Sequence, residues 1–245
     1  MRTKEILLIA LLLIAVSAIL YTVHYAIFHD VHHIFIYMVG DLAFLPLEVL
    51  ILTLIVDRLL SEREKRARQY KMNMVIGAFF STVGRELLRH MAALTGNQEV
   101  IAAQAGIDPE WSEQRIRRAI VWAESERFQV QPDPEILAKL GEVLAEYREF
   151  MLRLLENPML LENATFADLL WAVFHLEEEL SAREVLEESS ESDLEHLAND
   201  AERAYTNLLK QWLEYMIHLQ DNYPFLFSFA ARTNPLRPDA RPEVA

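Results

Sequence analysis

Two long apolar runs near the N-terminus constrain the fold of this 245-residue chain more than any other feature. Residues 6–23 contain no charged side chain, and a helix of about 20 apolar residues spans the roughly 30 Å hydrocarbon core of a bilayer. Residues 34–56 form a second run, interrupted by two acids, Asp41 and Glu48. Together the runs predict a two-span transmembrane helical hairpin over residues 1–60, in contact with the lipid bilayer.

The basic residues that flank the hairpin predict its orientation, because cytoplasmic flanks of membrane spans are enriched in lysine and arginine. Arg2 and Lys4 precede the first run, and the second run is followed by Arg58, Arg63, Lys65, Arg66, Arg68 and Lys71. We therefore expect both termini in the cytoplasm and the protein in the inner or plasma membrane. A signal peptide cleaved near Ala18 is the alternative, but the apolar run continues to Phe28, which favours an uncleaved span.

Charge is distributed unevenly along the chain. Residues 1–96 carry 10 basic and 8 acidic side chains, so the remainder carries 13 basic and 29 acidic ones. A nucleic-acid partner needs a basic surface, and the acidic C-terminal part lacks one. The absence of cysteine excludes disulfides and thiolate metal sites.

The acidic part of the chain has the signals of an all-α helical bundle over residues 97–235. Asp108-Pro109 and Asp133-Pro134 place a capping acid before a proline, and Thr165 and Ser192 each stand three residues before an acid. Apolar residues recur at intervals of three and four, and no stretch alternates as a strand would. These signals predict helices at about 109–127, 134–156, 166–189 and 192–221, followed by a disordered, proline-rich tail at 236–245.

The segment between hairpin and bundle has a heptad pattern. From Ile34 to Leu94 the only proline is Pro46, so the second span is expected to continue into a long juxtamembrane helix, with a coiled-coil-like part at residues 61–96. One seam of this pattern contains Asp41, Glu48, Ile55, Glu62, Gln69, Ile76, Val83 and His90. The pattern favours self-association into a homo-oligomer, and the alternative is a helix that packs against its own bundle.

The two acids within the second apolar run predict a functional site. A carboxylate inside a bilayer costs about 2.5–3.5 kcal/mol on insertion scales, so such residues usually face protein or water. In an oligomer Asp41 and Glu48, with Glu62 and Gln69 below them on the same seam, would form acidic rings that attract cations. The structural alternative is that Asp41 or Glu48 is protonated and bonded to Tyr21, Tyr25 or His24, which would lock the hairpin.

The turn between the two runs contains a second candidate set: His29, Asp30, His32 and His33. On a helix His29 and His33 would share one face, and imidazole with carboxylate is a ligand set that Zn²⁺ takes. The alternative, which we favour, is that Asp30 caps the second helix while the histidines anchor the turn at the membrane interface. A pH-responsive turn is a variant of this interpretation.

Two weaker patterns lie in the bundle, Asp193-x-x-His196 and His175-x-x-Glu178. A di-metal carboxylate bundle needs Glu-x-x-His twice and two further glutamates, so surface charge is the better interpretation. The chain contains no TVGYG-like filter, Walker motif, GxGxxG loop, nucleophile elbow or HExxH helix, so no enzyme class is indicated.

These patterns favour an oligomeric integral membrane protein that forms a cation channel or transport pathway lined by the acids of the second span. The alternative function is a membrane-anchored helical scaffold or signalling protein whose external histidine-rich turn senses metal or pH.

Overall fold

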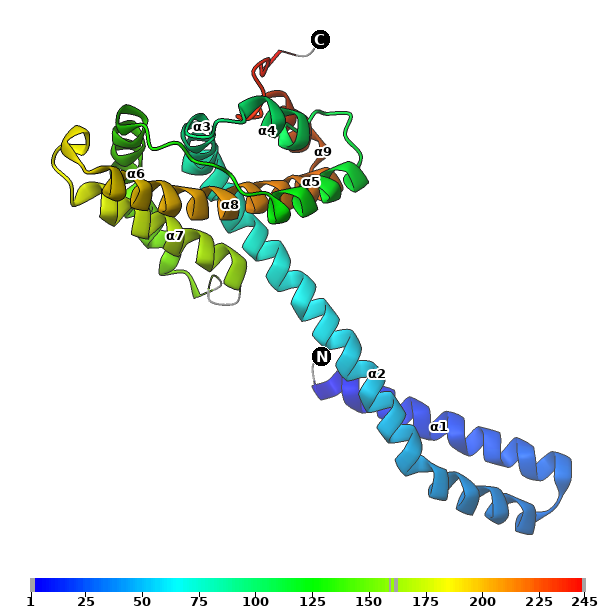
Figure 1. The fold of residues 1–245 in the computed structure, drawn as a ribbon. Helices are drawn as coiled ribbons and strands as arrows, with labels where there is room; N and C mark the ends of the chain where they lie inside the picture. The colour runs from blue at the N-terminus through cyan, green and yellow to red at the C-terminus, as the bar shows by residue number, and fades with distance from the viewer. Residues whose placement is uncertain (1–2, 159, 161–162, 244–245) are drawn as a thin grey trace. The chain divides into compact units, whose positions relative to one another are not determined.

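A computed structural model describes residues 3–158, 160 and 163–243 as an all-α chain (Figure 1). This confirms the predicted fold class: the described residues contain no strand, and Thr95 and Val130 form an isolated bridge. The helices are α1 (Thr3–Phe28), α2 (Val31–Phe79), α3 (Arg85–Ala93), α4 (Gln98–Ala105), α5 (Glu113–Ser125), α6 (Pro134–Leu155), α7 (Ala164–Ser181), α8 (Glu191–Asn222) and α9 (Pro224–Arg232). A π-helical turn at Phe80–Gly84 joins α2 to α3, and a short 3₁₀ turn at Leu186–Glu188 precedes α8.

The chain divides into two compact units, residues 1–65 and 66–245. The first unit contains α1 and the N-terminal part of α2, which meet at a turn of two residues. Among its described side chains between residues 4 and 65, only His24, His33 and Ile34 are partly buried. Stretches within Leu7–Phe28 and Val31–Ala93 are long and apolar enough to cross a membrane, and the most apolar window of each has no buried residue.

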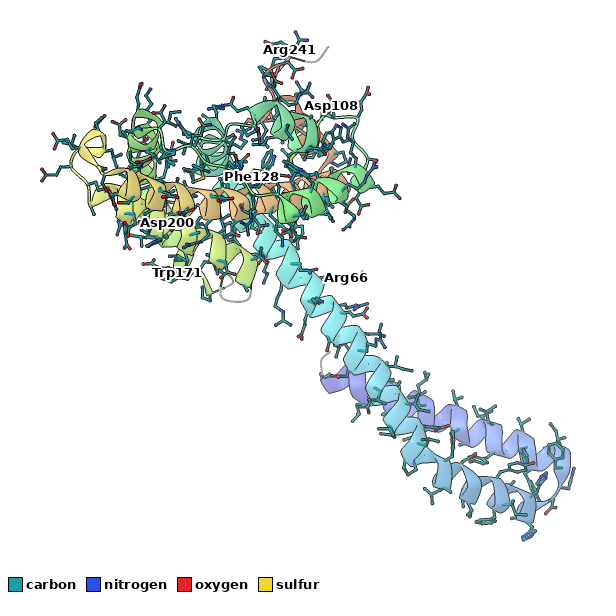
Figure 2. All side chains as sticks on the ribbon, viewed as in Figure 1. Arg66, Asp108, Phe128, Trp171, Asp200 and Arg241 are labelled. Atoms are coloured by element: carbon teal, nitrogen blue, oxygen red, sulfur yellow. The ribbon has the colours of Figure 1, made fainter. Side chains whose placement is uncertain are left out.

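The second unit packs around α8, which contacts α7 and α5 along its length and also packs on α3 and α9 (Figure 1). Aromatic rings pack against one another in the core. The ring centroids of Phe80 and Trp212 lie 5.1 Å apart, and those of Phe128 and Tyr205 lie 4.9 Å apart. Phe128 lies among the packed helices, whereas Trp171 on α7 remains 64% exposed (Figure 2).

Several helix ends differ from the sequence prediction. The helix expected at 109–127 begins at Glu113, because Ser112 is its N-cap and Asp108 instead closes a turn with the backbone N–H of Glu110. The cap at Asp133 is confirmed, since its carboxylate accepts from two backbone N–H groups of α6. The caps of α7 and α8 are Asn163 and Ser190, so Thr165 and Ser192 are not the capping residues predicted.

The helix expected at 166–189 ends at Ser181. Arg183 holds this end: its guanidinium donates to both carboxylate oxygens of Asp193 at 2.7 and 2.8 Å and also pairs with Glu179 at 2.9 Å. Since Asp193 lies in the first turn of α8, the two helices are joined across their connection. No glycine or proline follows Ser181 closely, so this end has no local stop signal.

The tail predicted to be disordered at 236–245 is packed as far as it is described. Leu236 is buried in the core, and Arg237 forms ion pairs with Asp108 and Asp239. Prolines oppose helix formation here but do not prevent one apolar side chain and one guanidinium from docking. Residues 244–245 lie outside the described part of the chain.

The C-terminal part of the heptad seam packs inside the second unit. Ile76 and Val83 of the seam are buried there, and so are their neighbours Met72, Phe79 and Phe80. The π-helical turn also adds a residue to one turn, which rotates the following positions by about 100° relative to a continuous α-helix. The stretch that stays uncovered and available to a second copy therefore ends near residue 70.

Candidate functional site

The first unit contains a cleft between α1 and α2, with a volume of about 550 Å³. It is lined by both helices on either side of the hairpin turn. The lining residues are Ser17, Leu20, Tyr21, His24, Phe28, His33, Ile34, Tyr37 and Asp41. Polar groups thus converge between two helices whose other surfaces are strongly apolar.

His24 and His33 are partly buried polar residues of this cleft. The ring of His24 lies 4.7 Å from that of Phe28 and 5.8 Å from that of His33, whose own ring lies 4.7 Å from Tyr37. The Nε2 atom of His24 is buried and has no hydrogen-bond partner among the described residues. A buried ring nitrogen without a partner is costly, so it suits a bound water or ion that completes its hydrogen bonding.

Asp41 lines the same cleft as Tyr21 and His24. Tyr21 and His24 are two of the three partners that the structural alternative proposed for the acids of the second apolar run. Asp41 is exposed and forms no hydrogen bond or ion pair with another described residue. Of the four residues predicted to line an ion pathway, Asp41 lines this cleft.

The other three predicted pathway residues lie elsewhere on α2 and are exposed. Glu48 lies two turns beyond Asp41, past Pro46. Glu62 lies 3.6 Å from Arg58, one turn before it, in an exposed ion pair. Gln69 belongs to the second unit.

The histidine-rich turn is built around Asp30. His29 adopts a left-handed conformation, with φ at 54°, and its N–H donates to Tyr25 O at 2.9 Å. The Asp30 carboxylate accepts from the backbone N–H groups of His32 and His33 at 2.8 and 3.3 Å, as an N-cap does. Because α2 begins only at Val31, His29 and His33 do not share a helix face, which corrects the geometry expected for a zinc site.

Within the described residues, His29, Asp30, His32 and His33 do not bring three ligand atoms together. The turn therefore has the capped arrangement of the interfacial-anchor alternative.

The two metal-like patterns of the bundle separate in the fold. Asp193 is held by Arg183, whose guanidinium lowers the pKa of that carboxyl group. Glu178 is largely exposed and lies 4.0 Å from Arg148. His175 and His196 instead both lie against Asp200, a residue that the sequence interpretation missed. Its one available signal was the spacing of four residues between His196 and Asp200.

Comparison with known proteins found two family models. The N-terminal helical domain of MJ1433 matches residues 2–60, and the C-terminal helical domain of uncharacterized protein MJ1433 matches residues 68–232. Uncharacterized protein MJ1433 of Methanocaldococcus jannaschii is 42% identical over 238 residues, which cover 95% of this chain and 93% of that protein. No solved structure matches. The gap between the two family domains contains the division of the fold at residue 65.

Proposed function

The chain belongs to the family of uncharacterized protein MJ1433 through both of its helical domains, and from this premise we propose that it is an integral membrane protein whose N-terminal hairpin forms an oligomeric cation pathway. In this proposal α1 and the first part of α2 cross the bilayer. Both termini face the cytoplasm, where the second unit forms a helical domain.

Exposure of apolar side chains supports the membrane assignment. Large apolar residues along α1 and the part of α2 in the first unit are more than 40% exposed, among them Leu8, Leu12, Leu42 and Leu54. Monomeric soluble proteins rarely expose contiguous apolar patches of more than a few hundred Å². Lipid covers such a surface, and the carbonyl and N–H groups of both segments are satisfied within helices, as a bilayer requires.

Single-cysteine labelling tests the topology, and the natural lack of cysteine makes the background clean. His32→Cys in the turn should react with a membrane-impermeant maleimide added outside cells. Val100→Cys, an exposed position in α4, should react only after the membrane is opened. Outside labelling of Val100→Cys would refute the orientation.

The observation that carries the cation proposal is the cleft between two apolar helices that Asp41 lines together with His24, whose Nε2 has no hydrogen-bond partner among the described residues. A carboxylate in the bilayer is retained at a cost of about 2.5–3.5 kcal/mol, and a cation or proton at that position offsets the cost. The neighbouring Tyr21 and Tyr37 hydroxyls are further oxygen groups at the cleft. The site chemistry is therefore that of a small cation or proton, not of an anion.

The exposed seam supports the oligomer of this proposal, because its residues from Asp41 to Gln69 are uncovered in a single chain. Packing of copies along this seam repeats Asp41 and Glu48 by symmetry. Repeated acids repel one another, and a cation that enters the ring relieves the repulsion.

Flux in proteoliposomes tests the pathway. The double variant Asp41→Asn, Glu48→Gln should lower cation flux while the oligomer remains intact, because amides still hydrogen-bond and no longer repel. Asp57→Asn is the matched control: it removes one acid near the end of the apolar run, off the seam, and should leave flux unchanged.

A different result would favour the second candidate. If the wild type carries no cation at any pH and the double variant dissociates on a sizing column, the acids hold the hairpin together. The protein would then be a membrane-anchored helical scaffold.

A further inference from the structure

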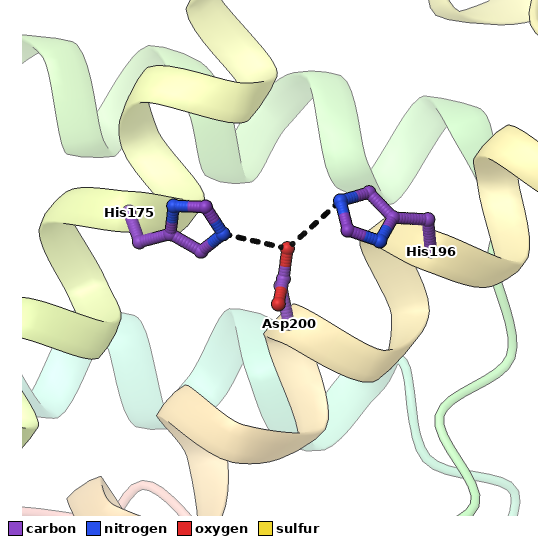
Figure 3. A group of neighbouring side chains, drawn as sticks. All are labelled: His175, His196 and Asp200. Atoms are coloured by element: carbon purple, nitrogen blue, oxygen red, sulfur yellow. Dashed lines mark ion pairs between the residues drawn. The ribbon is translucent and has the colours of Figure 1, made fainter.

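A second polar cluster lies on the face shared by α7 and α8, independent of the hairpin. His175 projects from α7, while His196 and Asp200 project from successive turns of α8, and the three side chains converge (Figure 3). The Nε2 atoms of His175 and His196 lie 3.2 and 3.4 Å from Asp200 Oδ2. One ligand atom from each residue lies within 4.8 Å of the other two.

Asp200 is the anchor of this cluster. Its side chain is only 3% exposed. Arg203 lies 3.3 Å from Oδ1, whereas Oδ2 is buried and has no hydrogen-bond partner among the described residues. A carboxylate oxygen that is buried without a hydrogen bond is expensive unless another group completes it. This oxygen is the atom that faces both imidazoles.

The separations fit a shared metal ion. Metal–nitrogen and metal–oxygen bonds of about 2.0–2.2 Å place neighbouring ligand atoms roughly 3.0–3.5 Å apart in octahedral or tetrahedral coordination. Both measured imidazole–carboxylate distances fall in this range. Two imidazoles and one carboxylate are also a ligand set that divalent zinc and iron take in proteins.

We propose that His175, His196 and Asp200 form a binding site for a divalent first-row transition metal ion, with Zn²⁺ as the reference ion. The ion bonds to the two Nε2 atoms and to Asp200 Oδ2, and it joins α7 to α8. The imidazoles are 43% and 53% exposed, so the ion enters from solvent and keeps open coordination positions for water.

Glu179 is the next carboxylate at the site. Its Oε2 lies 3.8 Å from His196 Nε2, and it stands four residues after His175, as Asp200 stands four after His196. Each helix thus contributes one histidine and one acid to the same face. Because Arg183 also holds Glu179, we assign Glu179 a supporting position beside the metal and not a required ligand.

The competing interpretation is a pair of imidazolium–carboxylate ion pairs without a metal. The two differ in their response to added metal: a metal site binds Zn²⁺ and is stabilised by it, whereas ion pairs alone gain no stability from Zn²⁺.

Calorimetric titration of ZnCl₂ into the full chain, purified in detergent and stripped with EDTA, tests the site. The reference protein carries His29→Ala and His33→Ala, which removes any contribution of the hairpin turn to Zn²⁺ binding. It also serves as a control for the cluster variant, because each pair of substitutions removes two imidazoles. This protein should bind one Zn²⁺ per chain at pH 7.5 and melt at a higher temperature with Zn²⁺ than without.

Substitutions at the cluster should remove this binding. In the reference protein, His175→Ala with His196→Ala should abolish the site, Asp200→Asn should weaken it at least about tenfold, and Glu179→Gln should weaken it less. The proposal is supported if the cluster variants lose Zn²⁺ binding while the reference protein retains it. Absence of binding in the reference protein, or equal affinity in the double cluster variant, overturns it.

A Co²⁺ spectrum guards against a variant that fails to fold. If the double cluster variant loses its helical circular dichroism, the visible absorption of Co²⁺ bound to the reference protein tests the metal site instead. Ligand-field bands that differ from those of aqueous Co²⁺ support the site, and an aqueous spectrum overturns it.

Discussion

The second unit should not fold without the end of α2, the π-helical turn and α3. These segments supply nine large apolar side chains to the core: Met72, Ile76, Phe79, Phe80, Val83, Leu87, Leu88, Met91 and Leu94. At about 1.5–3 kcal/mol each, their burial is worth roughly 14–27 kcal/mol, or about 8 kcal/mol at the least if a compact unfolded state removes 40%. A whole domain is stable by only about 5–15 kcal/mol.

The loss also falls on the helices that remain. α3 packs on α6 and α8, so its removal exposes the facing surfaces of two helices that must still be ordered. A fragment of residues 97–243 should therefore lack a cooperative transition, whereas a fragment of residues 66–243 should melt cooperatively.

Thermal melts of both fragments, followed by circular dichroism and by tryptophan fluorescence, measure this difference. Phe80→Ala in the longer fragment is an intermediate case. Its ring contacts those of Phe79, Trp212 and Tyr215, and its loss should lower the free energy of unfolding by about 3–5 kcal/mol. A fragment of residues 97–243 that melts at the same temperature as residues 66–243 would refute the reasoning.

Two further predictions concern charged groups of the second unit. Arg148→Met should lower the unfolding free energy by about 1–3 kcal/mol in urea titrations, because the buried Glu177 carboxylate loses its guanidinium partner, and Glu177→Gln in the same chain should restore part of the loss; wild-type stability in the single variant would contradict this. The pKa of Asp108 is lowered, chiefly by the hydrogen bond from the Glu110 backbone N–H and also by Arg237. The ionised carboxylate therefore adds to the free energy of unfolding above the usual pKa near 3.8, and this contribution disappears as pH falls through the lowered pKa. Asp108→Asn should thus reduce the melting temperature at pH 6 and have no effect in strong acid, and an equal reduction at both pH values would exclude the charge as the cause.

Local signals along the sequence were enough to predict most helices, because capping and apolar periodicity act within one or two turns. Asp133 before Pro134 marks the start of α6 correctly. The end of α7 escaped prediction because it depends on Arg183, which reaches across the connection to Asp193. An ion pair between helices leaves no trace in the periodicity of either helix.

The heptad seam shows a similar limit. The pattern is continuous from Asp41 to His90, yet it covers two surroundings: the seam is exposed as far as Gln69 and is buried at Ile76 and Val83. Periodicity reports which side of a helix is apolar, but not whether the partner is another copy or the helix's own domain. The π-helical turn at Phe80–Gly84 interrupts the heptad period, and no proline or glycine pair in the sequence predicts this interruption.

The candidate sites follow the same physical rule. Asp41 and Glu48 are easy to select because a charge within an apolar run is conspicuous, but the residues that accompany Asp41 in the cleft come from α1 and depend on how the two helices meet. Asp200 is harder to select, since α8 contains several acids and only the burial of Asp200 distinguishes it from the others. Its neighbour at four residues, His196, follows from helix geometry, whereas His175 arrives on another helix through the packing of α7 on α8. The spacing of residues along the sequence therefore identifies only the site residues that one helix provides. The remaining residues of the site come from a second helix, and the packing of the two helices determines which ones they are.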